Sequence, residues 1–268
     1  TGWRRPLDLG RLRAAIAGNE PVVLWGTRVF SDLVWLWWAL DGLCRIGVAR
    51  PRFFLVRPYS EHPFATVGHL TPDEVRLSFA TASPVTDDEW REGAKLWMQY
   101  ASPSPLAFDA ARRRGSAAFP ELLTSAELHG AWFPRHKDGR LRLSELDEVL
   151  LGATSDSWNT TTNIIEGLPD NRIDQLMSTF DAYFVVERLR MWATHGVLKR
   201  KILTARNPYE QDRFRTTDRA RALLDHGLER VGDAPPMYVG GCRVNDPASA
   251  WIRIESDSRW RLAAQSVP

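Results

Sequence analysis

The segment from residue 21 to residue 56 constrains the fold most, because two short apolar runs flank an apolar helical stretch. The runs Pro21–Trp25 and Pro51–Val56 have the length and apolar character of buried strands. The residues between them, from Phe30 to about Ile46, are predicted to form a helix. A strand, a helix and a strand in such close succession predict a βαβ unit with two parallel strands.

The predicted helix carries clear signals at both ends. Either Ser31 or Asp32 can serve as its N-cap, since each side chain can accept a hydrogen bond from the first turn, and Gly47 can end it. Apolar residues occur on nearly every face, which predicts burial on more than one side. We expect Cys44, within this helix, and the distant Cys242 to be small core residues.

Ligands of open α/β sheets usually bind beyond the carboxyl ends of the strands. The residues expected at that edge, and predicted to bind a small anionic ligand, are Thr27, Arg28, Ser31, Asp32 and Arg57. Two arginines and a helix N-terminus all suit an anion. The adjacent residues Glu61 and His62 are candidate catalytic residues, because such a pair can move a proton.

A purely structural interpretation of this edge stays open. The sequence contains neither a G-x-G-x-x-G nor a G-x-x-x-x-G-K-[ST] phosphate-binding motif. The same residues can form a polar rim above the sheet, with Arg28 and Arg57 either solvated or paired to Asp32 and Glu61. The sequence therefore leaves the enzyme question open.

The second half of the chain has a different pattern. Residues 134–140 are polar, and we expect them to link a first domain, residues 1–133, to the rest. Residues 141–232 carry several amphipathic helices, then a predicted β-hairpin, then another helix, an order typical of winged-helix domains. Residues 233–268 read as a small antiparallel β tail. The predicted fold class is thus α/β, with a Rossmann-like domain followed by a winged-helix-like domain.

Nucleic-acid binding is an alternative function for the second half. The basic residues of the predicted hairpin, which could contact phosphates, are Lys199, Arg200, Lys201, Arg213 and Arg215. The preceding helix, 181–195, offers mostly core residues rather than polar groups for base edges. The alternative is an edge hairpin kept soluble by its charges.

Composition narrows the classes of function. The formal net charge is only +2, from 35 basic and 33 acidic residues, which does not favour a strongly basic nucleic-acid protein. No run reaches the roughly 20 apolar residues that a membrane helix needs, so we expect a cytoplasmic protein without a membrane partner. None of the six histidines has zinc-ligand spacing, and we predict no metal and no cofactor. The twelve tryptophans indicate a large core or, alternatively, an aromatic pocket or partner surface.

Several segments together resemble bacterial proteins that join two domains of unknown function, numbered 1835 (amino-terminal) and 3658 (carboxyl-terminal). The segments are VVLWGTRVFSDLVWLWWALDGL, VGHLTPDEV, LDEVLLGATSDSW, VVERLRMWATHGVL and TDRARALLDHG. The resemblance implies a strand and a G-D-S-type turn ahead of Thr1, so that the first domain here would lack its first strand. It implies no established activity.

The sequence thus favours a binding or regulatory protein whose first domain recognises a small anionic ligand or a protein partner. One alternative is an enzyme that acts on a nucleotide-like or other anionic substrate, and another is a winged-helix nucleic-acid-binding protein.

Overall fold

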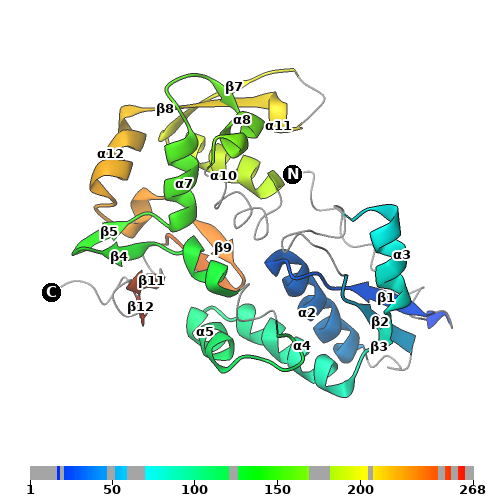
Figure 1. Ribbon diagram of the computed structural model, residues 1–268. Helices are drawn as coiled ribbons and strands as arrows, with labels where there is room; N and C mark the ends of the chain where they lie inside the picture. Colours follow the sequence, from blue (N-terminus) through cyan, green and yellow to red (C-terminus); the bar gives the residue numbers. More distant parts are fainter. Residues whose placement is uncertain are drawn as a thin grey trace. The chain divides into compact units, whose positions relative to one another are not determined.

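The computed structural model describes residues 17–18, 21–46, 52–58, 70–120, 126–168, 182–204, 208–246, 251–254 and 259–262. It is a mixed α/β structure with several small sheets (Figure 1). The chain divides into two compact units. The first unit comprises Thr1–Met98 and Ser116–Pro120, and the second comprises Gln99–Gly115 and Glu121–Pro268.

The first unit contains the predicted strand–helix–strand segment. Its elements are β1 (Val22–Trp25), α2 (Phe30–Arg45), β2 (Phe53–Val56), α3 (Pro72–Ala80), β3 (Ser83–Pro84) and most of α4 (Asp87–Tyr100). Strands β1 and β2 are parallel, as predicted, and β3 adds an antiparallel edge to β2. Helix α2 packs closely on β1, since a Cβ on Gly26 would lie 2.6 Å from Leu36 Cδ2.

Two expectations about α2 are wrong. Its N-cap is Val29, without a side-chain cap, rather than Ser31 or Asp32. The helix begins at Phe30, as expected, and Asp32 lies in its first turn, where a carboxylate suits the helix dipole. Cys44 is exposed rather than part of the core, because one side of the helix faces solvent. Trp35 of the same helix is 58% exposed.

Side-chain caps begin the next two helices of the chain. Thr71 caps α3 and forms a capping box with Glu74, and Thr86 does the same with Glu89 at the start of α4. Aromatic residues fill the core of the first unit. Trp37 contacts Phe119 edge to face, with ring centroids 6.1 Å apart.

The second unit contains the remaining elements. The helices are α5 (Pro105–Arg114), η3 (Ala126–Trp132), α7 (Glu145–Ala153), α8 (Thr161–Glu166), α10 (Ala182–Thr194), α11 (Pro208–Gln211), α12 (Asp218–His226) and η4 (Val231–Asp233). The strands are β4 (Arg135–Lys137), β5 (Arg140–Arg142), β6 (Asn159–Thr160), β7 (Leu198–Ile202), β8 (Asp212–Thr216), β9 (Met237–Val239), β10 (Cys242–Val244), β11 (Trp251–Ile254) and β12 (Arg259–Leu262).

The predicted linker at 134–140 is wrong. Strands β4 and β5 form a hairpin there, and its turn places Asp138 and Gly139 at positive φ. The hairpin belongs to a four-stranded sheet of order β12-β11-β4-β5, in which β11 runs parallel to β4. The sequence did not indicate these strands, because one face of the hairpin is exposed to solvent and its residues are therefore charged rather than apolar.

The predicted β tail shares the core of the helical region rather than standing apart. Strands β9 and β10 pair around a tight bend at Gly240 and Gly241. Their buried residues belong to the same apolar cluster as α7 and α10. A Cβ on Gly241 would lie 1.9 Å from the carbonyl oxygen of Ala101, so only glycine fits this approach.

A buried ion pair holds α7, α10 and the tail together. Arg188 and Asp147 are both fully buried, and Arg188 donates from Nε and Nη2 to the two carboxylate oxygens at 2.7 and 2.6 Å. Trp192 Nε1 and Ser144 Oγ also donate to this carboxylate. Arg188 Nη1 donates to the carbonyl of Pro235 at 2.9 Å, so the charges and hydrogen bonds are satisfied together.

Candidate functional site

The structure describes most of the predicted ligand site at the carboxyl ends of β1 and β2. Thr27 is buried, and its hydroxyl donates to Asp32 Oδ2 at 2.6 Å and accepts from the backbone N–H of Val29. Ser31 is half-buried and Arg28 is exposed. Glu61 and His62 lie outside the described residues, so their catalytic role stays a prediction.

Arg57 is engaged in a structural contact rather than directed at a ligand. Its Nη1 donates to Glu89 Oε1 at 2.8 Å, and its Nη2 donates to the carbonyl of Ala118 at 2.7 Å. Glu89 also accepts from the backbone of Thr86, so one carboxylate caps α4 and binds Arg57. Because of these contacts, Arg57 is not placed to bind an anion together with Arg28.

Replacing Arg57 with methionine is expected to lower the free energy of unfolding by about 1 kcal/mol. The change removes an ion pair to a carboxylate that is mostly buried, but the arginine side chain itself is 37% exposed. Urea denaturation measures the loss, and Arg28→Met at an exposed position serves as the control. Equal stability of the two variants would contradict the structural role of Arg57.

The predicted basic hairpin is confirmed as β7 and β8, which pair antiparallel, and β6 adds a third strand beside β8. In this register Lys199 lies opposite Arg215, and Lys201 lies opposite Arg213. Side chains alternate across a strand, so these four cationic side chains share one face. We call this set of four residues the basic face.

The opposite face of the hairpin packs inward. Phe214 and Asp212 are fully buried there. Asp212 accepts from Arg190 Nε of α10 at 2.5 Å and from Arg200 Nε at 2.7 Å. Arg190 therefore links the hairpin to α10, whereas Arg200 pairs within the hairpin. Arg200 does not belong to the basic face, unlike the other predicted phosphate contacts.

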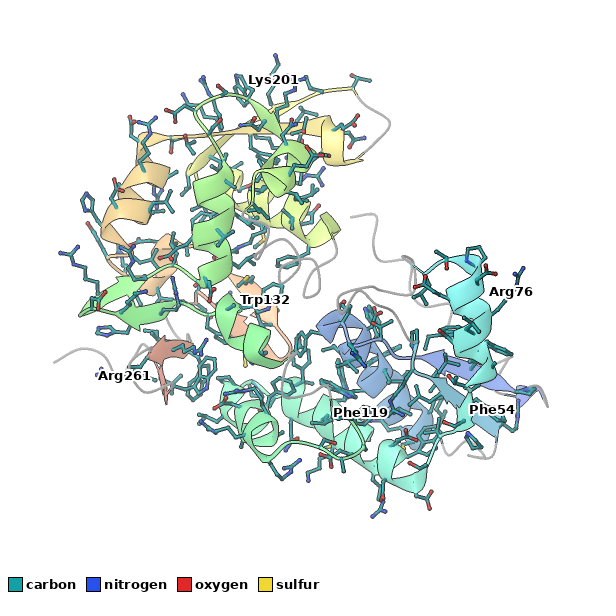
Figure 2. The ribbon with its side chains drawn as sticks, in the orientation of Figure 1. Phe54, Arg76, Phe119, Trp132, Lys201 and Arg261 are labelled. Atoms are coloured by element: carbon teal, nitrogen blue, oxygen red, sulfur yellow. The ribbon has the colours of Figure 1, made fainter. Side chains whose placement is uncertain are left out.

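The basic face is exposed and carries little opposing charge. Lys199, Lys201 and Arg213 are exposed, and within the described ranges they form no ion pair. Lys201 projects from the outer side of the hairpin (Figure 2). Arg215 is half-buried and stacks over the ring of Trp158, with its guanidinium carbon 4.7 Å from the ring centroid.

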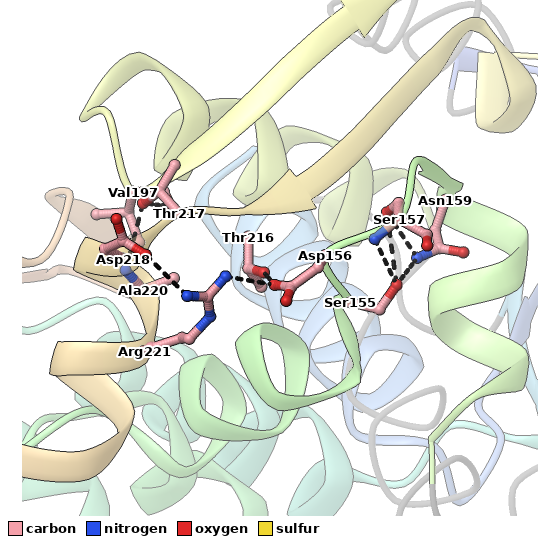
Figure 3. Close-up of polar contacts among 10 residues, drawn as sticks. All are labelled: Ser155, Asp156, Ser157, Asn159, Val197, Thr216, Thr217, Asp218, Ala220 and Arg221. Atoms are coloured by element: carbon pink, nitrogen blue, oxygen red, sulfur yellow. Dashed lines mark hydrogen bonds and ion pairs between the residues drawn. The ribbon is translucent and has the colours of Figure 1, made fainter.

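A polar junction fixes the position of β8 (Figure 3). Asp156 accepts from Thr216 and from Arg221 of α12, and Thr217 caps α12 while donating to the carbonyl of Val197. The hydrogen bond from Thr216, and next that from Arg221, hold the pKa of Asp156 below its ordinary value. Asp156 interacts electrostatically with Arg215 of the basic face, but its hydrogen bonds are with Thr216 and Arg221.

Other types of site receive no support from the described residues. Among them, no group of three or more histidine, cysteine, aspartate or glutamate side chains is placed to hold a metal ion. Helices of the described part of the chain fall short of the length and apolar character needed to cross a membrane.

Comparisons with protein-family models, with curated proteins and with solved structures found no match. The resemblance to the two domain families of unknown function therefore stays a prediction.

Proposed function

We propose that the protein binds duplex nucleic acid through the basic face of the β7–β8 hairpin. The observation that carries this proposal is the cross-strand pairing of like charges, Lys199 with Arg215 and Lys201 with Arg213. Like charges that face each other directly destabilise a sheet. A row of phosphates offsets that repulsion, and no ion pair of the described residues does so for the two lysines and Arg213.

The order of the elements supports a winged-helix-like interpretation of this region. Helices α7, α8 and α10 precede the hairpin, and the short strand β6, which lies between α7 and α8, pairs with β8. Similarly, the parallel β1–α2–β2 unit supports the prediction of a Rossmann-like first domain. Both fold assignments remain proposals alongside the function.

The proposed contacts are with the phosphates of the nucleic acid rather than with its bases. Helix α10 buries Val185, Val186, Leu189 and Trp192, and these residues are unavailable to a groove. Specific recognition needs polar side chains on base edges, whereas lysine and arginine on a ribbon neutralise the backbone. We therefore expect binding that depends little on sequence and strongly on salt.

The salt dependence tests this proposal quantitatively. A basic face that neutralises its full set of phosphates predicts a slope of log K against log salt of about −3.6, because each phosphate contributes roughly 0.9. The double variant K199Q/K201Q should reduce the magnitude of the slope by about 1.8 and weaken binding to all sequences alike. Fluorescence anisotropy with a labelled DNA duplex provides both readouts.

A matched control distinguishes an effect of the basic face from an effect of the protein's net charge. The double variant K137Q/R140Q removes the same charge from exposed positions on the β4–β5 hairpin, where Lys137 and Arg140 also lie opposite each other, and should leave the slope unchanged. K199Q/K201Q should also be at least as stable as the parent chain, since the like-charge pairs are relieved. Undetectable binding at low salt, or equal slopes for the two double variants, would reject the proposal.

A further inference from the structure

An aromatic side chain lies beside the basic face, on the same side of the sheet. Strand β6 pairs antiparallel with β8, and Thr160 lies opposite Arg213. Trp158 lies two residues before Thr160, so the same register places it opposite Arg215. The guanidinium carbon of Arg215 is 4.7 Å from the centroid of the Trp158 ring, in agreement with this register. Residues opposite each other in an antiparallel pair share a face of the sheet, so Trp158 borders the basic face one strand further across.

The surroundings of Trp158 differ from those of a core tryptophan. Its side chain is half-buried, and it is not among the described residues that pack against the apolar core of the second unit. Arg215 lies over the indole, and no other ring or cation contacts this indole within the described ranges. By contrast, Trp192 of α10 is fully buried and donates its Nε1–H to Asp147. Trp158 therefore keeps aromatic surface that the core of the protein does not cover.

Hydrogen bonds fix the segment that carries Trp158 (Figure 3). The backbone N–H of Thr216 donates to the carbonyl of Ser155 at 3.0 Å, and its hydroxyl donates to Asp156. Asn159 Nδ2 donates to Ser155 Oγ at 2.7 Å. These bonds join the residues on both sides of Trp158 to β8 and to each other. The indole is thus positioned before a ligand arrives, which lowers the entropic cost of binding.

An aromatic ring beside a group of cations is the combination by which proteins bind unpaired bases. Lysine and arginine neutralise the phosphates, and a base stacks on the aromatic ring. Bases within a duplex are already stacked on their neighbours, so their faces are not accessible to a side chain. Unpaired nucleotides that continue from a duplex offer both the phosphates and a free base face.

We propose that Trp158 stacks on an unpaired base, so that the hairpin binds a duplex with a single-stranded extension more tightly than a blunt duplex. The inference rests on the proposed function, because the basic face would hold the phosphates of the same nucleic acid. It requires no open charge on Arg215, which interacts electrostatically with Asp156 and whose role here is to hold the indole.

Three DNA ligands that share one duplex test the inference by fluorescence anisotropy. The first is blunt, and the second carries short thymidine extensions, 3′ at one end and 5′ at the other. The third carries abasic extensions of the same length and therefore has the same number of phosphates. The thymidine ligand should bind at least about fivefold more tightly than either of the others, as stacking of one base on an aromatic ring predicts.

The same measurements distinguish failure of this inference from failure of the proposed function. Equal affinity for the thymidine and abasic ligands, with salt-dependent binding of the blunt duplex retained, would overturn the stacking role and leave the proposed function standing. Undetectable binding of all three ligands at low salt would reject both. This comparison uses the unaltered chain, so it decides the matter even if a variant disturbs folding.

Variants assign the preference to one side chain. Trp158→Leu should abolish the preference for thymidine over abasic extensions without changing the salt slope, and Trp158→Phe should keep the preference, since a phenyl ring also stacks. K199Q/K201Q should do the converse, reducing the slope and keeping the preference. The control is Trp35→Leu, at a 58% exposed position of the first unit, which should bind like the parent chain. Retention of the preference in Trp158→Leu would overturn the inference.

Discussion

Replacing Asp147 with alanine is expected to lower the free energy of unfolding by about 3–5 kcal/mol, the usual cost of breaking a buried pair. The change leaves the guanidinium of Arg188 buried without its counter-charge, in a region where both side chains have no exposed surface. It also removes the acceptor of Trp192 Nε1. Urea denaturation gives the size of the loss, and hydrogen exchange of the α7 and α10 amides locates it.

Two further variants make this prediction specific. Asp73→Ala breaks an exposed pair with Arg76 and should cost no more than about 1 kcal/mol. The double variant D147A/R188M removes both charges and should recover part of the stability lost in the single variant, because an apolar pair leaves no buried charge unmatched. A loss from Asp147→Ala no larger than that of the exposed control would show that the buried pair contributes little.

The second large effect is a loss of folding stability at low pH. His129 is 3% exposed and lies among the rings of Tyr100, Phe108, Phe133 and Trp260. Burial lowers its pKa from 6.5 to about 3, although the nearby Asp109 acts to raise it. The unfolded chain therefore takes up a proton on this histidine at a higher pH than the folded chain does.

The sign of the pH dependence follows from that difference. The contribution of His129 is fully present above pH 6.5, and it is lost progressively as the pH falls towards 3. Between pH 7 and pH 4, this residue alone should cost about 3 kcal/mol. Thermal or urea unfolding as a function of pH measures the loss. His129→Phe, which suits an aromatic surrounding, should flatten the dependence.

The exposed His226 provides the comparison for this experiment. His226→Gln should retain the pH dependence of the parent chain between pH 7 and pH 4. An unchanged dependence in His129→Phe would mean that other groups dominate the acid sensitivity, contrary to the prediction.

Local signals predicted the parts of the fold that depend on nearby residues. Capping residues such as Thr71 and Thr86 act within one helical turn, so they depend on only a few neighbouring residues. The parallel β1–β2 pair follows from the length of the helical crossover between two apolar runs. The β4–β5 hairpin was missed because its residues are largely charged and its partner strand β11 is distant in the chain.

The same distinction between local and distant interactions applies to the candidate sites. The cationic residues of the hairpin were predicted, because strand alternation and charge are local properties. The sequence did not predict that Arg57 pairs with Glu89 or that Arg200 pairs with Asp212, because each pair joins residues that only the folded chain brings together. The sequence also did not predict the surface pocket lined by His136, Leu141, Glu229, Ile252, Ile254 and Arg261, because five of these residues come from four strands whose pairing is not a local property of the sequence.

The parallel contact between β4 and β11 has a consequence for synthesis on the ribosome. Strand β4 is translated well before β11 and β12, which complete the sheet beside it. Until then the β4–β5 hairpin has an unpaired edge, which can pair with another nascent chain. This sheet can therefore be completed only after β12 has been translated.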